Sequence, residues 1–141
     1  MSEKKIEAIV VDDQPEVAAF LEKSLNFKGI SVRKFSSAAE ALEDFKTRGC
    51  DLFIIDVVMP GTGGTEMVRR IREINREVPI IMMTGYHYEE LQEVQLEVSA
   101  VLYKPFAMRA LFDTVNEVKL QIESRKRQEE SSQEDSDPGK E

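Results

Sequence analysis

The chain has 141 residues, of which 41% are hydrophobic and 33% charged, and its formal net charge is −8. This length suits one globular domain that buries about two thirds of the surface of its unfolded chain. Much of the acidity lies in Gln128–Glu141, which leaves the rest of the chain at only −3. The composition therefore offers no basic excess for a nucleic-acid surface. The single cysteine, Cys50, excludes an internal disulfide and a multi-cysteine metal site.

The two ends of the sequence suggest the limits of the domain. The first apolar run, Ile6–Val11, is too short for a signal peptide or a membrane span. We therefore expect a cytoplasmic protein without a membrane segment. From Gln128 onward no residue is apolar, and Ser, Glu, Asp and Gln dominate. We predict one domain over residues 1–127 and an acidic disordered tail over residues 128–141.

The first elements are predicted to be a strand, a helix and a second strand. Ile6–Val11 is apolar except for Glu7, as in a strand that is covered on both faces. Pro15 suits the first turn of a helix, and Gly29 suits its end. Ile30–Phe35 alternates in polarity, which predicts a weaker strand at an edge of the sheet.

The middle of the chain repeats this order. Ser37–Glu40 has the pattern of a capping box and opens a second helix that ends near Gly49. Leu52–Ile55 is predicted to be a buried strand, and Met59–Gly64 a loop. The apolar face of a third helix follows, formed by Met67, Val68, Ile71 and Ile74.

The last part of the domain adds two strands and two helices. Val78–Met83 and Ala100–Tyr103 are predicted strands. Between them lies a less regular fourth helix, marked by Leu91, Val94 and Val98. The last helix begins near Met108, with an apolar face of Leu111, Val115, Val118 and Ile122. This face either packs on the sheet or extends beyond the domain as a dimer seam.

The alternation of elements predicts the fold class. Five strands that alternate with five helices indicate an α/β protein with a parallel sheet between two helical layers. Right-handed crossovers leave few possible topologies. We predict a flavodoxin-like, doubly wound sheet with strand order 2-1-3-4-5.

Polar residues stand where the apolar runs end. Asp12 and Asp13 follow the first run, Asp56 the third, Thr84 the fourth and Lys104 the fifth. Because the carboxyl ends of parallel strands share one edge of a sheet, these side chains should meet in the crevice where such sheets bind ligands. Singly, each could be a helix cap or a turn residue. Together they predict a site for a divalent cation and a phosphoryl group.

The chemistry of this site follows from its side chains. The Asp56 carboxylate can attack phosphorus and form a mixed anhydride. Asp12 and Asp13 can hold Mg²⁺, which prefers oxygen ligands and often takes one or two carboxylates together with phosphate. Lys104 can neutralise one phosphoryl oxygen, and the Thr84 hydroxyl can donate a hydrogen bond to another.

Four segments taken together resemble the response regulator receiver domain of two-component phosphorelays. They are VVDDQP, IIDVVMPGTGG, IIMMTG and LYKPF, and they match in type, order and structural context over roughly residues 5 to 125. The resemblance implies a signalling switch rather than a conventional enzyme. Its implied phosphoryl-transfer residues are Asp56, Thr84 and Lys104, with Asp56 as the acceptor. Its implied Mg²⁺ ligands are Asp12, Asp13, Asp56 and the backbone carbonyl of Val58.

The resemblance also implies partners. The donor would be a phosphohistidine on a sensor histidine kinase or a phosphotransfer protein. The only histidine of this chain, His87, falls in a predicted loop and is not needed for that role. Phosphorylation would switch a partner-binding surface on the last helices and strand, which a downstream protein or output domain would recognise. No direct binding of nucleic acid by this chain is expected.

The chain departs from the family pattern at two places. An aromatic residue often stands three positions before the family lysine, but Val101 stands there, and the nearby aromatic residue is Tyr103. Positions 58 and 86 influence access of hydrolytic water in this family. Here they are Val58 and Tyr86, which should shield the acyl phosphate and make its loss slow.

The sequence also bears on three other classes of protein. A phosphatase of the haloacid-dehalogenase type needs a second acid two residues after Asp56, where this chain has Val58. A flavin-phosphate binder would present amides and hydroxyls to the phosphate, which Asp12 and Asp13 would instead repel. The last alternative is an interaction module that has the fold but is never phosphorylated.

Overall fold

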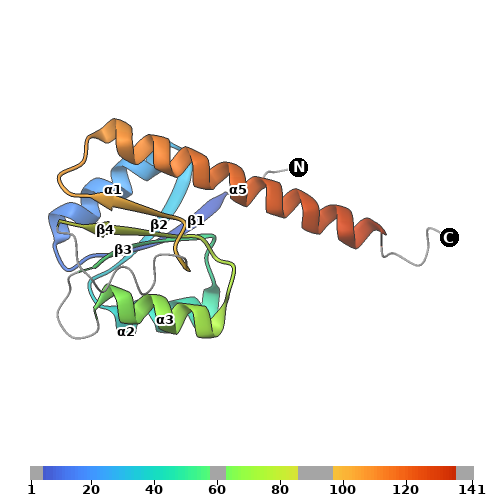
Figure 1. Cartoon of the computed structure of the whole chain (residues 1–141), viewed down its shortest axis with the longest axis horizontal. Coiled ribbons are helices and arrows are strands. Elements are labelled where there is room, and N and C mark those ends of the chain that lie inside the picture. The colour runs from blue at the N-terminus through green and yellow to red at the C-terminus, as the bar shows by residue number, and fades with distance from the viewer. Residues whose placement is uncertain (1–4, 58–62, 86–96, 136–141) are drawn as a thin grey trace.

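A five-stranded parallel sheet forms the centre of the molecule (Figure 1). The computed structural model describes residues 5–57, 63–85 and 97–135, with side chains as far as residue 128. The strand order is β2-β1-β3-β4-β5, as predicted. The strands are β1 (Ile6–Val11), β2 (Ile30–Phe35), β3 (Leu52–Asp56), β4 (Ile80–Thr84) and β5 (Ala100–Tyr103).

Helices cover both faces of the sheet (Figure 1). In the described part of the chain they are α1 (Pro15–Phe27), α2 (Ala38–Arg48), α3 (Gly64–Ile74) and α5 (Met108–Asp135). Helices α1 and α5 lie on one face, and α2 and α3 on the other (Figure 1). The fourth predicted helix falls mainly on residues 86–96, which lie outside the described residues.

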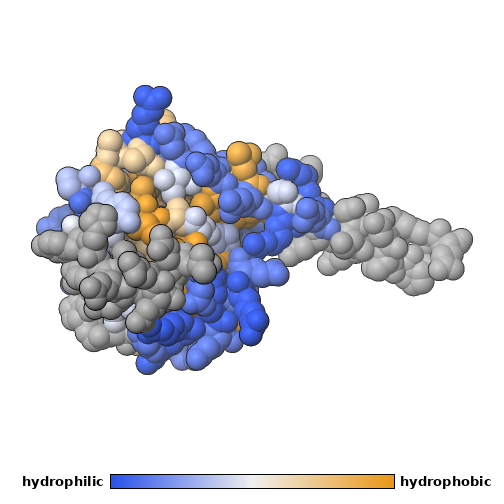
Figure 2. Space-filling view, viewed as in Figure 1, coloured by the Kyte–Doolittle hydropathy of each residue, from blue (hydrophilic) through white to orange (hydrophobic). Residues whose placement is uncertain are grey.

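The core has two halves because successive side chains of a strand point to opposite faces. In β1, Ile9 and Val11 pack with α2 and α3, whereas Ala8 and Val10 pack with α1 and α5. All four are fully buried, which explains why this central strand is almost continuously apolar in sequence. Hydrophilic residues cover the region of α3, while hydrophobic ones show mainly near α5 (Figure 2).

Local signals in the sequence account for most element boundaries. The Ser37 hydroxyl accepts a hydrogen bond from the Glu40 amide at 3.3 Å, so the predicted helix cap is confirmed. Strand β4 begins two residues later than predicted, at Ile80. The reason is local, because the Val78 amide donates to the Asn75 side chain at 2.9 Å and is used in a turn.

The apolar face of α5 packs on the sheet. Its residues are buried, with exposed fractions of 5% or less, and they belong to the α1-side core: Leu111, Val115, Val118 and Ile122. Their burial shows that this face packs within the domain, the first of the two predicted roles. Among the described residues, no helix is both long enough and apolar enough to cross a membrane.

The structure differs from the prediction in residues 128–135. Helix α5 continues through Asp135 and projects past the sheet, whereas a disordered tail was predicted from Gln128 (Figure 1). The physical reason is that adding a residue to an existing helix costs little, and Gln and Glu are good helix formers. Residues 136–141, the rest of the predicted tail, lie outside the described part.

Candidate functional site

The predicted site residues meet at the carboxyl edge of the sheet. Asp12 and Asp13 follow the end of β1, Asp56 ends β3, Thr84 ends β4 and Lys104 follows β5. Strands β1, β3, β4 and β5 are neighbours and run parallel, so their last residues share one edge. The register places Asp56 beside Met83, one residue before Thr84. The sequence pattern thus predicted the meeting point of these residues.

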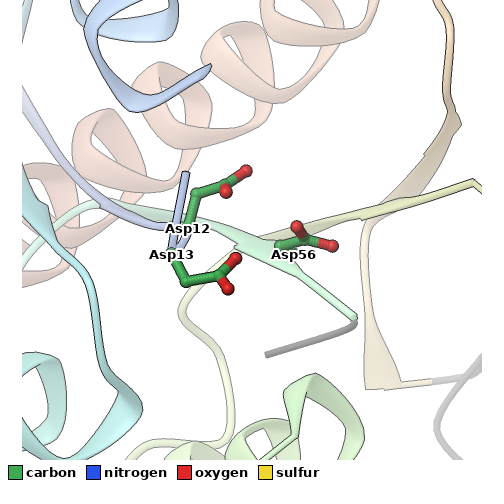
Figure 3. A group of neighbouring side chains, drawn as sticks. All are labelled: Asp12, Asp13 and Asp56. Carbon is green, nitrogen blue, oxygen red and sulfur yellow. The ribbon is translucent and has the colours of Figure 1, made fainter. Parts of the chain in front are cut away.

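Three carboxylates form an acidic cluster at this edge: Asp12, Asp13 and Asp56 (Figure 3). One oxygen from each lies within 4.8 Å of the others, a spacing that could hold a metal ion. Asp12 and Asp56 are buried, with exposed fractions of 2% and 6%, whereas Asp13 is exposed. The cluster is therefore open to solvent on the side of Asp13.

Lys104 supplies the positive charge of the site. Its ammonium donates a hydrogen bond to Asp56 Oδ2 at 3.1 Å and lies 3.6 Å from Asp12 Oδ2. Its backbone amide donates to the Thr84 carbonyl at 2.7 Å, which fixes the end of β5 against β4. The Lys104–Pro105 peptide bond is cis. Lys104 thus bridges two of the three acids of the cluster.

The surroundings of Asp12 oppose the ionisation of its carboxyl group. Its Oδ1 accepts a hydrogen bond from the Gln14 amide at 2.9 Å. Within the described part of the chain, its buried Oδ2 accepts no hydrogen bond. Burial raises the pKa of Asp12, and nearby Asp56 and Asp13 raise it further, while the Gln14 amide and Lys104 oppose the shift. A cation bound to Asp12 Oδ2 would offset the free-energy cost of keeping this buried carboxylate ionised.

Thr84 occupies the last position of β4 and is fully buried. Its neighbour in the register of β5 is Tyr103, whose exposed fraction is 46%. Val101, at the position where the family often has an aromatic residue, packs instead against the α2–α3 core. Val58, Tyr86 and His87 lie outside the described residues, so the predictions that rest on them stay predictions.

One residue near the site was missed in the sequence. Gly64 was assigned to a loop, but it is the first residue of α3, and its amide donates to the Val57 carbonyl at 2.9 Å. Its Cα faces the backbone of Asp56. The adjacent pair Gly63–Gly64, soon after β3, was the available signal for such a close approach.

Comparison with known proteins identifies the family. The family model described as "Response regulator receiver domain" matches residues 8–116. The chain belongs to this family. As a receiver domain of a two-component response regulator, it is a signalling switch.

Relatives of known name and structure agree with this assignment. Regulatory protein VanR of Enterococcus faecium is 37% identical over 100 residues, which are 70% of this receiver domain and 43% of VanR. The chain spans about half the length of the curated relatives that it matches. Chemotaxis response regulator CheY4 of Vibrio cholerae is 28% identical with a TM-score of 0.75, over 82% of this chain and 99% of CheY4.

A second solved structure bears on the acidic cluster. Response regulator TrrA of Thermotoga maritima is 27% identical with a TM-score of 0.74. The match covers 80% of this receiver domain and 98% of TrrA, whose structure is described as a complex with Mg²⁺ and BeF.

Proposed function

We propose that this receiver domain accepts a phosphoryl group on Asp56 in a reaction that depends on Mg²⁺. The donor is a phosphohistidine of a sensor histidine kinase or of a phosphotransfer protein. One observation carries the proposal: a buried strand-end carboxylate lies 3.1 Å from a lysine ammonium and beside two further acids. A carboxylate placed in this way has a cation to balance the charge of an incoming phosphate.

The transfer itself exchanges one bond for another. An Asp56 carboxylate oxygen bonds to phosphorus as the phosphorus–nitrogen bond to the donor imidazole breaks. The electron pair of the broken bond stays on the imidazole nitrogen, which takes up a proton. Lys104 balances charge on one phosphoryl oxygen, and the Thr84 hydroxyl donates a hydrogen bond to another.

The residues present fit Mg²⁺. The cluster offers only oxygen ligands, and the buried Asp12 Oδ2 has no hydrogen-bond donor in the part of the chain that the structure describes. We assign Asp12, Asp13, Asp56 and the Val58 carbonyl as its ligands. The bound ion supplies positive charge that offsets repulsion between the carboxylate and the phosphoryl group. The complex of TrrA with Mg²⁺ and BeF supports this choice of metal.

The output of the switch is proposed to pass through β5 and the helices beside it. Lys104 contacts Asp56 and Asp12 by its side chain and Thr84 by its backbone, and it directly precedes the segment that leads into α5. A phosphoryl group on Asp56 would give Lys104 and Thr84 new contacts to its oxygens, and this change would therefore shift the end of β5. The partner that recognises this change is a downstream protein or an output domain. An output domain would fit the relatives, because the matched region is only about half of their length.

Labelling with a small phosphodonor tests the proposal. The native chain with Mg²⁺ should gain one phosphoryl group by intact-mass spectrometry. Asp56→Asn keeps the size of the side chain but removes the nucleophile, so labelling should vanish while the circular dichroism spectrum is unchanged. Asp113→Asn, a change at an exposed acid of α5, is the matched control and should label normally. Stoichiometric labelling of Asp56→Asn would move the acceptor to another carboxylate.

A further inference from the structure

The amino end of α3 lies against the backbone of the phosphoacceptor residue. A Cβ atom on Gly64 would lie 2.6 Å from the Asp56 carbonyl oxygen and 2.7 Å from Val57 Cα. Carbon atoms of real side chains are essentially never found so close to other heavy atoms. Both neighbours are backbone atoms, so they cannot rotate away as the end of a flexible side chain would. Any side chain at position 64 must therefore move either α3 or the strand end.

The strand end is held from two sides. The Val57 amide donates to the Met83 carbonyl of β4 at 2.9 Å, and the Val57 carbonyl accepts from the Gly64 amide at 2.9 Å. Strand β3 is itself hydrogen-bonded between β1 and β4. A shift of the Asp56–Val57 backbone would strain these bonds and would carry the Asp56 carboxylate with it.

Helix α3 is held in place by the side chains that it packs into the core. Met67, Val68 and Ile71 are fully buried in the core that α3 shares with α2 and the sheet. Movement of the helix away from β3 would open space around these side chains and lose their packing. Because both responses are costly, the displacement caused by a side chain at position 64 would be divided between the helix and the acceptor strand.

We propose that Gly64 is a positioning residue for Asp56. Its lack of a side chain lets α3 support the acceptor backbone, and this support keeps the Asp56 carboxylate 3.1 Å from the Lys104 ammonium. The inference rests on the proposed function, since it concerns the rate of phosphoryl transfer to Asp56. A displacement of well under 1 Å matters here, because a misplacement of about 1 Å can cost about a hundredfold in rate.

The neighbouring glycine provides a matched control. A Cβ atom on Gly63 would have one near neighbour, the Val57 carbonyl oxygen at 3.6 Å, which is an ordinary contact. The φ angle of Gly63 is −74°, which any residue can adopt. Gly63→Ala thus adds the same methyl group one residue away without pressing on the strand.

The experiment compares initial rates of labelling by a small phosphodonor, measured by intact-mass spectrometry over a series of Mg²⁺ concentrations. The variants are Gly64→Ala, Gly63→Ala and Ile71→Val, the last of which loosens α3 in the core without touching Asp56. All are measured at a temperature at which circular dichroism shows them to be fully folded. We expect Gly63→Ala and Ile71→Val to stay within about twofold of the native maximal rate. Gly64→Ala should lose about tenfold or more at saturating Mg²⁺.

Each result has a distinct meaning. A Gly64→Ala chain that labels as fast as Gly63→Ala overturns the positioning role and leaves the proposed function intact. Absence of labelling in the native chain overturns the proposed function, and the role of Gly64 with it. If Gly64→Ala is unfolded in buffer, all variants are compared in trimethylamine N-oxide, which favours the folded state. A variant that stays unfolded there assigns Gly64 to folding alone and also overturns the proposal.

Discussion

Among individual residues, Asp12 is a site carboxylate whose ionisation is opposed by burial. Its pKa is raised above the usual 3.8, chiefly by burial. The folded protein therefore holds the Asp12 proton more tightly than the unfolded chain does. Ionisation of Asp12 consequently lowers the stability of the metal-free protein as the pH rises through 3.8 and then through the higher pKa of the folded state.

Asp12→Asn should therefore stabilise the metal-free protein. In EDTA at pH 7 we expect a higher melting temperature than for the native chain. The difference in melting temperature between the two proteins should narrow as the pH falls through the folded pKa of Asp12 and should vanish below 3.8, where Asp12 is protonated in both states. With Mg²⁺ the native chain should have the higher melting temperature, because Mg²⁺ binds its folded state more tightly than it binds folded Asp12→Asn. Thermal melts over pH with and without Mg²⁺ check this, and a less stable Asp12→Asn protein in EDTA at pH 7 would contradict it.

Cys50 should be a poor nucleophile in the folded protein. Burial raises the pKa of its thiol to about 12, so almost no thiolate is present at pH 8. We expect alkylation by iodoacetamide at that pH to be at least about a hundredfold slower than in urea, where the thiol has an ordinary pKa. Mass spectrometry of the alkylated chain over time measures both rates. Equal rates would show that the thiol is accessible and ionises normally.

The strand-end pattern predicted which side chains meet at the carboxyl edge of the sheet, but not the close approach of Gly64. Asp12, Asp56 and Lys104 could be predicted because a polar residue directly after an apolar strand is visible in the sequence. The role of Gly64 depends on how closely α3 approaches β3, a distance that arises only when the helix packs. The raised pKa of Asp12 has burial as its main cause, and burial depends on the packed fold rather than on the order of residues in the sequence.

Among the elements, α3 is fastened at its end by one side chain. The Arg72 guanidinium donates from Nη1 to the Val78 carbonyl at 2.7 Å and from Nε to the Glu97 carbonyl at 3.0 Å. Nη1 also donates to the Asn75 carbonyl at 3.3 Å. Arg72 thus joins α3 to the start of β4 and to the segment before β5. Partial burial lowers the pKa of this guanidinium.

Arg72→Ala should destabilise the fold by about 1–3 kcal/mol, because several backbone carbonyls lose their donor. Arg70→Ala on the same helix is the control. Arg70 pairs with Glu66 at 3.3 Å on an exposed surface, so its loss should cost less than about 1 kcal/mol. Urea unfolding of both variants compares the two free energies. Similar values for the two would show that the Arg72 contacts contribute little.

The strongest sequence patterns gave the most reliable element boundaries. The helix cap at Ser37 and the apolar stripe of α5 are local features and were confirmed. The start of β4 was misplaced because the Asn75 side chain competes for the backbone amide of Val78, which hydropathy does not reveal. The end of α5 was misplaced because a polar segment that continues an existing helix has the composition of a disordered tail.

At the scale of the whole molecule, α5 runs from the carboxyl ends of the parallel strands to their amino ends. It begins a few residues after Lys104, at the site edge. Toward its other end, Arg125 donates to the Glu77 carbonyl at 2.8 Å, and Lys126 pairs with Asp51 at 3.3 Å. Glu77 and Asp51 precede β4 and β3, so these contacts hold α5 at the amino ends of the strands. We infer that the stable domain ends close to residue 127, just after the last of these contacts that the described side chains make.

Truncation tests this boundary. Removal of residues 128–141 should change the free energy of unfolding by less than about 0.5 kcal/mol. Removal of residues 118–141 also deletes the buried Val118 and Ile122 and should cost more than about 3 kcal/mol. Urea unfolding measures both changes. A large loss on removing residues 128–141 alone would place part of the stabilising structure beyond residue 127.

The measurement that tests the central claim most directly is chemical mapping of the phosphorylated residue. Borohydride reduces an acyl phosphate to an alcohol, so a phosphorylated aspartate becomes homoserine and can be located by peptide mass spectrometry. After treatment with a small phosphodonor and Mg²⁺, the proposed function predicts homoserine at position 56 alone, and none when EDTA replaces Mg²⁺. Homoserine at position 12 or 13, or at no position, would contradict the assignment of Asp56 as the acceptor.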